Sequence, residues 1–209
     1  AAGRDEAKAQ IDAAIERLQN LFETMLPEKQ AATIERRSIE GSAYKRRAWI
    51  SEESRAGDLA RMREAYLGAY QRRDELGYGD FAYPLLNVLA ADLAIAWQAG
   101  KAGPSGAAKT SFNQQLEIAK AEVERSYNEN PTFWNTVMLA EIKLYGALNN
   151  RQNSGSERDE IVDGYLEARK RSSPREFESA LDQIDFMAEM AKPMPAINQS
   201  LTQLRGRLN

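Results

Sequence analysis

Apolar residues recur three or four positions apart along almost the whole 209-residue chain, and strict alternation over five or more residues is hard to find. This spacing places apolar side chains on one face of an α-helix, whereas a half-buried strand needs alternation. The composition agrees, with 32 Ala and 19 Leu against only 4 Val and 6 Thr. Ala and Leu favour helices, while Val and Thr favour strands. The sequence therefore predicts an all-α protein.

Start and stop signals divide this pattern into consecutive helices. The expected helices cover residues 4–25, 28–50, 58–76, 81–98, 111–129, 131–148, 156–170, 174–191 and 196–208. Longer Gly-rich or polar connections are expected at 100–109 and 149–155. The other connections are short, so neighbouring helices should be antiparallel, which leaves a bundle or a stack of helical hairpins.

Several helix ends carry residues that cap helices. Pro27 is expected to end the first helix, and Asp80 is expected to be an N-cap. Asn130–Pro131 is typical of an N-cap followed by the first helical position. Ser173 and Glu176 have the spacing of a capping box, in which each side chain accepts a backbone N–H of the other residue.

The chain contains no His and no Cys, and this excludes several kinds of site. Ser-His-Asp and Cys-His nucleophiles, thiolate or imidazole zinc sites, iron–sulfur clusters and disulfides are all impossible. A net charge of −3 argues against a nucleic-acid partner, and no run approaches 18 apolar residues, so no membrane partner is expected. We expect no cofactor and no metal site. Because the chain begins with Ala, we also expect it to be a piece of a longer protein.

Two short motifs are similar to catalytic signatures. Gly103–Thr110 nearly spells a P-loop, but Ala108 replaces the second required Gly, and the preceding run is typical of a helix rather than of the strand that a P-loop follows. Ser42–Lys45 matches Ser-x-x-Lys without the partner motifs of that class. We therefore predict that the chain is not an enzyme. A nucleotide-dependent switch or enzyme built on Gly103–Thr110 remains an alternative.

Internal repetition narrows the fold further. The small–apolar–small–proline order of Ala119, Val123, Ser126 and Pro131 resembles the second helix of a tetratricopeptide repeat. Ile161, Tyr165 and Ala168 repeat the four-then-three interval, as do Met62, Tyr66 and Ala69. Gly41 and Tyr44 match the Gly-x-x-Tyr of the first helix, where Gly permits close approach of the second helix. The resemblance covers Ile34–Pro174 as three degenerate hairpins.

One stretch is more specific. ERRSIEGSAYKRRA (residues 35–48) and YPLLNVLAADL (residues 83–93) resemble tetratricopeptide modules of large bacterial proteins that carry a CHAT caspase-like protease, or the TRAF-binding region of stress-activated kinase kinases. The resemblance implies one domain, 1–209, folded as a right-handed α-solenoid. Residues 1–27 and 193–209 would be capping helices around hairpins in 28–192. It also implies a non-catalytic interaction, sensing or scaffold module of a bacterial, cytoplasmic, regulatory or effector protein with flanking domains.

The resemblance further implies a ligand groove, because first helices of tetratricopeptide pairs line a concave surface on which Lys, Arg and Asn hold peptide carboxylates. By helical spacing, one side of helix 28–50 carries Arg37, Ser38, Ser42, Lys45 and Arg46. Asn87 lies on a comparable side of helix 81–98. The expected groove residues are Arg37, Ser42, Lys45, Arg46 and Asn87. The expected partner is a protein or peptide with acidic or C-terminal carboxylate groups.

Two other interpretations of the helical pattern stay open. A purely structural spacer would present no ligand groove, and a bundle closed around one core would have no concave surface. The aromatic residues are expected to pack between helices rather than to hold a ligand. This set comprises Tyr44, Trp49, Tyr66, Tyr70, Trp97 and Trp134.

Overall fold

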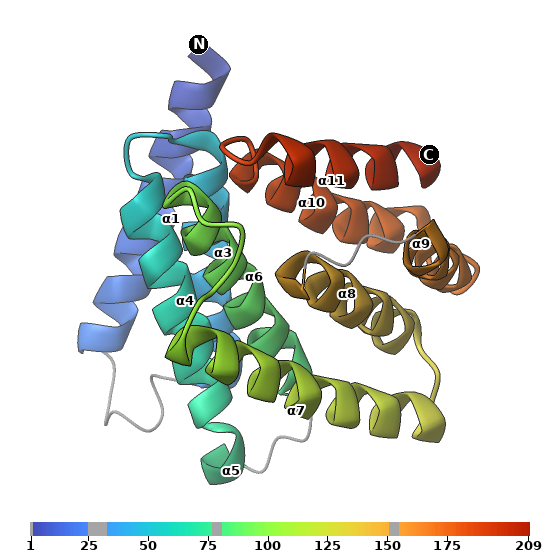
Figure 1. Cartoon of the computed structure of the whole chain (residues 1–209). Coiled ribbons are helices and arrows are strands. Elements are labelled where there is room, and N and C mark those ends of the chain that lie inside the picture. The colour runs from blue at the N-terminus through green and yellow to red at the C-terminus, as the bar shows by residue number, and fades with distance from the viewer. Residues whose placement is uncertain (1, 25–32, 77–80, 151–154) are drawn as a thin grey trace. The chain divides into compact units, whose positions relative to one another are not determined.

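The computed structural model describes residues 2–24, 33–76, 81–150 and 155–209 (Figure 1). Within these ranges every regular element is a helix and no strand occurs, so the predicted all-α class is confirmed. The chain divides into two compact units, Ala1–Ala91 (unit 1) and Asp92–Asn209 (unit 2), and the boundary falls inside helix α6. The predicted single domain with two terminal capping helices stays a prediction.

Unit 1 is organised around a hairpin of two helices, against which a third helix packs. Its elements are α1 (Ala2–Thr24), α3 (Ile34–Ile50), α4 (Arg55–Gln71), the short α5 (Arg73–Leu76) and the first turns of α6 (Ala82–Gln98). Helices α3 and α4 form the hairpin, and α1 lies along α3 (Figure 1). The Thr33 hydroxyl begins α3 by accepting the backbone N–H of Arg36 at 3.1 Å.

The hairpin is tight because a glycine faces an aromatic ring. A Cβ on Gly41 would lie 2.7 Å from two ring atoms of Tyr66, so only a glycine lets this ring sit against α3. Tyr44 on α3 is also buried, and Met62 and Ala69 on α4 are fully buried. The predicted roles of Gly41 and Tyr44, and of the four-then-three interval in α4, are therefore confirmed.

An arginine joins the three helices of unit 1. Arg47 on α3 donates through Nε to both carboxylate oxygens of Asp58 on α4, at 3.0 and 3.1 Å. Its Nη1 donates to Asp12 on α1 at 2.8 Å, and the Ser54 hydroxyl donates to Asp58 at 2.7 Å. The Asp58 side chain is only 2% exposed. A buried carboxylate needs such a set of donors, because an unpaired charge there would be costly.

Unit 2 is also built from helices that pack in pairs. Its elements are the last turns of α6, then α7 (Ala107–Glu129), α8 (Phe133–Asn150), α9 (Gly155–Arg169), α10 (Pro174–Met190) and α11 (Pro195–Arg207). Packed neighbours are α7 with α8, α8 with α9, and α10 with α11. A Cβ on Gly164 would lie 3.0 Å from the Cβ of Ala140, so α8 and α9 also approach closely. Ile161, Tyr165 and Ala168 are buried, as their interval predicts.

The observed helix ends differ from several of the predicted ones. Helix α7 begins at Ala107 rather than near residue 111, so the connection after α6 is shorter than predicted. Asn130 is the C-cap of α7 and not the N-cap of the next helix. The Thr132 hydroxyl accepts the backbone N–H of Asn135 at the start of α8 instead. Helix α8 also runs on to Asn150, into the segment predicted as a loop.

Other local predictions have mixed outcomes. The capping box of Ser173 and Glu176 at the start of α10 is confirmed. Trp134 is 46% exposed, so the prediction that it packs in the core is wrong. Pro27 and Asp80 lie outside the described residues.

Candidate partner-binding cluster

Polar side chains from three helices of unit 1 are linked to one another. The Ser42 hydroxyl on α3 lies 2.8 Å from the Tyr66 hydroxyl on α4, which lies 3.4 Å from the Tyr83 hydroxyl on α6. The Asn87 amide donates to the carbonyl oxygen of Tyr83 at 3.0 Å. Arg46 lies one turn beyond Ser42 and acts electrostatically on the Tyr66 hydroxyl. We call Ser42, Arg46, Tyr66, Tyr83 and Asn87 the polar cluster of unit 1.

The cluster has a buried part and an accessible part. Tyr66 is fully buried, whereas Tyr83 is 44% exposed and Arg46 is also exposed. The two tyrosine rings meet edge to face, with centroids 6.0 Å apart. Burial, and next the nearby Tyr83 hydroxyl, raise the pKa of Tyr66 well above its usual value of 10.0. The Tyr66 hydroxyl is therefore neutral at physiological pH, and Arg46 supplies the positive charge of the cluster.

Two buried oxygen atoms in this region have no hydrogen-bond partner among the described residues. One is Oδ1 of Asn87, a residue that is only 6% exposed. The other is Oγ of Ser38, which lies one helical turn before Ser42 on α3. An unsatisfied buried polar group costs about 1–3 kcal/mol. An N–H or O–H donor from a ligand that reached these oxygens would recover part of that cost.

The structure brings together some of the predicted groove residues and separates others. Ser42, Arg46 and Asn87 belong to the polar cluster. Arg37 instead faces α1, where its guanidinium lies 4.7 Å from the ring centre of Phe22, and it also pairs with Glu40 at 2.9 Å. Lys45 is half-buried and is engaged with another group of the protein. A partner-binding role for any of the five predicted residues stays a prediction.

Sequence reasoning missed the hydroxyl groups that connect the cluster. Tyr66 was expected in the core, and its ring is there, but its hydroxyl bonds to Ser42. Tyr83 was not singled out, although its four-residue distance from Asn87 places both on one side of a helix. A Tyr and an Asn at that spacing, in an otherwise apolar helix, are the signal that could have found them.

The two catalytic-type motifs lie in surroundings unlike those of their classes. Helix α6 precedes Gly103–Thr110 where a P-loop needs a strand, and Lys109 and Thr110 are exposed in the first turn of α7. The Ser42 hydroxyl pairs with the hydroxyl of Tyr66. In the ranges that the structure covers, no group of three or more metal-binding side chains gathers. No helix in those ranges has the length and apolar character needed to cross a membrane.

Paired helices with glycines at their close approaches, and with buried residues at four-then-three intervals, define a tetratricopeptide-like helical module. Residues 1–92 match the model of the family Tetratricopeptide Repeats-Sensor (TPR-S), and this range nearly coincides with unit 1. The match supports a tetratricopeptide-type module for residues 1–92, of a kind that suggests protein interaction or sensing. Comparisons with curated proteins and with solved structures returned no match.

Proposed function

We propose that the chain is a non-catalytic sensing module whose unit 1 binds an acidic peptide segment through the polar cluster. The observation that supports this proposal is that the polar cluster contains both an exposed cation and a hydrogen-bond acceptor without a partner. Arg46 is exposed, and Oδ1 of Asn87 is buried without a partner among the described residues.

A peptide carries both complementary groups. A side-chain or C-terminal carboxylate would accept charge-assisted hydrogen bonds from Arg46, with the hydroxyl of Tyr83 as a further donor. Oδ1 of Asn87 is buried, so a backbone N–H of the same peptide would donate to it once the side chains that cover it move aside. Recognition of a carboxylate together with a backbone donor would select extended acidic segments. We further propose, from the resemblance to modules of large bacterial proteins, that the module passes this binding event to flanking domains of a cytoplasmic regulatory or effector protein.

The test is a peptide screen by fluorescence polarisation on the full chain. Acidic peptides with a free C-terminus are compared with C-terminally amidated copies and with peptides in which Asp and Glu are replaced by Asn and Gln. We expect saturable binding that weakens at least ten-fold when the carboxylates are removed. If no acidic peptide binds better than its amidated copy or its Asn and Gln copy, the proposal fails and the spacer interpretation is favoured.

Two variants locate the site. Arg46→Glu should lower the affinity for a bound peptide at least ten-fold. Lys120→Glu, at an exposed position on α7, changes the net charge by the same amount and should leave the affinity unchanged. Asn87→Leu should also lose binding without losing stability, because it removes the unsatisfied Oδ1 and adds apolar volume. Unchanged affinity of both cluster variants would place the binding site elsewhere.

A further inference from the structure

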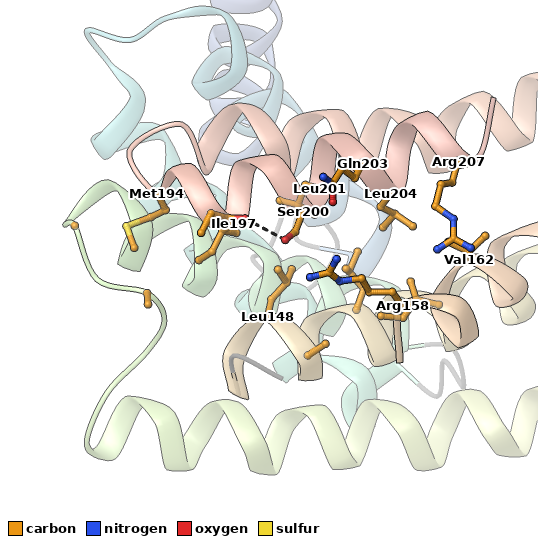
Figure 2. A pocket seen from close by; sticks show the side chains of 16 residues that line it. Leu148, Arg158, Val162, Met194, Ile197, Ser200, Leu201, Gln203, Leu204 and Arg207 are labelled. Carbon is orange, nitrogen blue, oxygen red and sulfur yellow. Dashed lines mark hydrogen bonds between the residues drawn. The ribbon is translucent and has the colours of Figure 1, made fainter. Parts of the chain in front are cut away.

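Unit 2 contains a cavity of about 530 Å³ that is separate from the polar cluster. Helices α8, α9 and α11 provide most of its walls, and the connection after α6 adds Gly100 and Ala102 (Figure 2). A volume of about 300–1,000 Å³ is typical of sites that enclose a small molecule. The cavity is thus large enough for a ligand of several carbon atoms, and every residue that lines it belongs to unit 2.

The wall of this cavity is mostly apolar. Leucine, isoleucine and valine side chains from the three helices form it, among them Leu148, Ile161, Val162, Ile197, Leu201 and Leu204. Val162, Leu201 and Leu204 are themselves buried, so the wall is fixed by packing. Such a wall favours a ligand with an apolar body, because moving that body out of water is favourable.

Two charged side chains are among the described residues that line the cavity, and both are arginines, although the chain as a whole has a net charge of −3. Figure 2 shows the guanidinium of Arg158 between α11 and Leu148 of α8, in the same region as Ser200. Arg207 extends toward α9, where it pairs with Asp159 at 2.9 Å. No carboxylate is among the described residues that line the cavity. The polar part of the cavity therefore favours an anionic group at Arg158, in addition to the interaction that this side chain already makes within the protein.

We propose that this cavity binds a small amphiphile, an aliphatic chain that ends in a carboxylate. The chain would lie against the Leu, Ile and Val wall, and the carboxylate would lie at Arg158, with Ser200 and Gln203 as neighbouring hydrogen-bonding groups. Arg and carboxylate form two parallel hydrogen bonds when their geometry allows it. The proposal is independent of the polar cluster in unit 1.

Isothermal titration calorimetry on the full chain tests the chain-length dependence. Hexanoate, octanoate and decanoate are titrated below the concentrations at which they form micelles. We expect the affinity to rise about three- to four-fold for each added CH₂ until the cavity is full. Absence of saturable binding by decanoate would overturn the proposal, and would leave the cavity as a seat for an apolar side chain of a partner protein.

The head group is tested by comparing decanoate with decanol on two matched variants. Arg158→Gln should weaken decanoate at least ten-fold and leave decanol nearly unchanged, because only the charged head group uses the guanidinium. Arg175→Gln, at an exposed position on α10 outside the lining, should bind both ligands as the parent chain does. Equal weakening of acid and alcohol by Arg158→Gln, or none, would contradict the assignment of the carboxylate.

A third variant tests whether filling the cavity prevents decanoate from binding. Ala147 on α8 lines the cavity and is only half-buried, so Ala147→Phe should fill part of the space. We expect this variant to lose decanoate binding while its helical circular dichroism spectrum is unchanged. Retained binding would show that decanoate binds elsewhere. Methyl chemical shifts in NMR spectra, followed at Leu201 and Leu204, give a second readout that does not depend on the heat of binding.

Discussion

A single methyl group added at Gly41 tests whether the hairpin of unit 1 depends on close packing against Tyr66. The new Cβ would lie 2.7 Å from Cδ2 and Cε2 of the Tyr66 ring and 3.0 Å from Cγ. That ring is fully buried, and its hydroxyl is held by Ser42, so the ring has little room to move. Overpacking of a well-filled core costs about 1–3 kcal/mol. Replacing Gly by Ala within a helix gains about 0.8–1 kcal/mol.

The net expectation for Gly41→Ala is therefore a loss of roughly 0–2 kcal/mol in the free energy of unfolding. Gly68 on α4 is the matched control, because a Cβ there meets no atom within 4 Å. Gly68→Ala should keep the helix gain without the clash and be stabilised by up to about 1 kcal/mol. The two variants should thus differ by about 1–3 kcal/mol, which is several degrees in the midpoint of thermal unfolding.

Urea and thermal unfolding followed by circular dichroism at the helical band measure both variants. A Gly41→Ala chain that is as stable as Gly68→Ala would show that the close approach to Tyr66 carries no packing cost. A double-mutant cycle makes the cause specific. In a Tyr66→Ala background, Gly41→Ala should no longer be destabilising, with a coupling free energy of about 1–3 kcal/mol.

Three further predictions concern charges and caps. Asp58→Ala should lower the free energy of unfolding in urea by about 2–3 kcal/mol, because Arg47 loses its buried partner. A loss below about 0.5 kcal/mol, which is on the order of a surface substitution, would contradict this. The side-chain hydrogen bond from Arg47 lowers the pKa of Asp12 below its usual 3.8, so its stabilisation is complete above that pH and is lost as the pH falls through the folded-state pKa. The stability difference between the parent chain and Asp12→Asn should accordingly shrink in acid titrations below pH 3.8, and a constant difference would argue against it. Ser173→Ala should lose about 1 kcal/mol, because the backbone N–H of Glu176 loses its acceptor, whereas the backbone N–H at position 173 still donates to Glu176. Thermal unfolding measures this loss, and an unchanged midpoint would contradict it.

Much of the fold could be predicted because helix formation depends on short-range spacing. The apolar pattern located the helices within a few residues, and Ser173 with Glu176 marked the start of α10 correctly. The errors occurred where two local signals compete. Asn130 can cap the start of a helix or end one, and here its extended backbone ends α7 while the Thr132 hydroxyl caps α8. The Gly-rich connection before α7 concealed the helix-forming Ala residues with which that helix begins.

The candidate sites were less predictable, because they depend on contacts between helices far apart in sequence. Helical spacing placed Ser42 and Arg46 together on α3. It could not show that the Tyr66 and Tyr83 hydroxyls would join them to α6, since that requires knowing which faces of α4 and α6 meet. The cavity of unit 2 was missed for the same reason. Its two arginines, Arg158 and Arg207, come from helices separated by α10 in sequence.

The buried, unpaired oxygens of Ser38 and Asn87 affect how this module would respond to laboratory evolution. Replacing either residue by an apolar one removes a buried oxygen that has no hydrogen-bond donor. Selection for heat resistance alone should therefore enrich such replacements early. Libraries selected in that way would yield modules that are more stable to heat but have lost polar groups that a ligand could contact. Screening for ligand retention alongside thermal tolerance would reveal whether the two properties trade against each other at these positions.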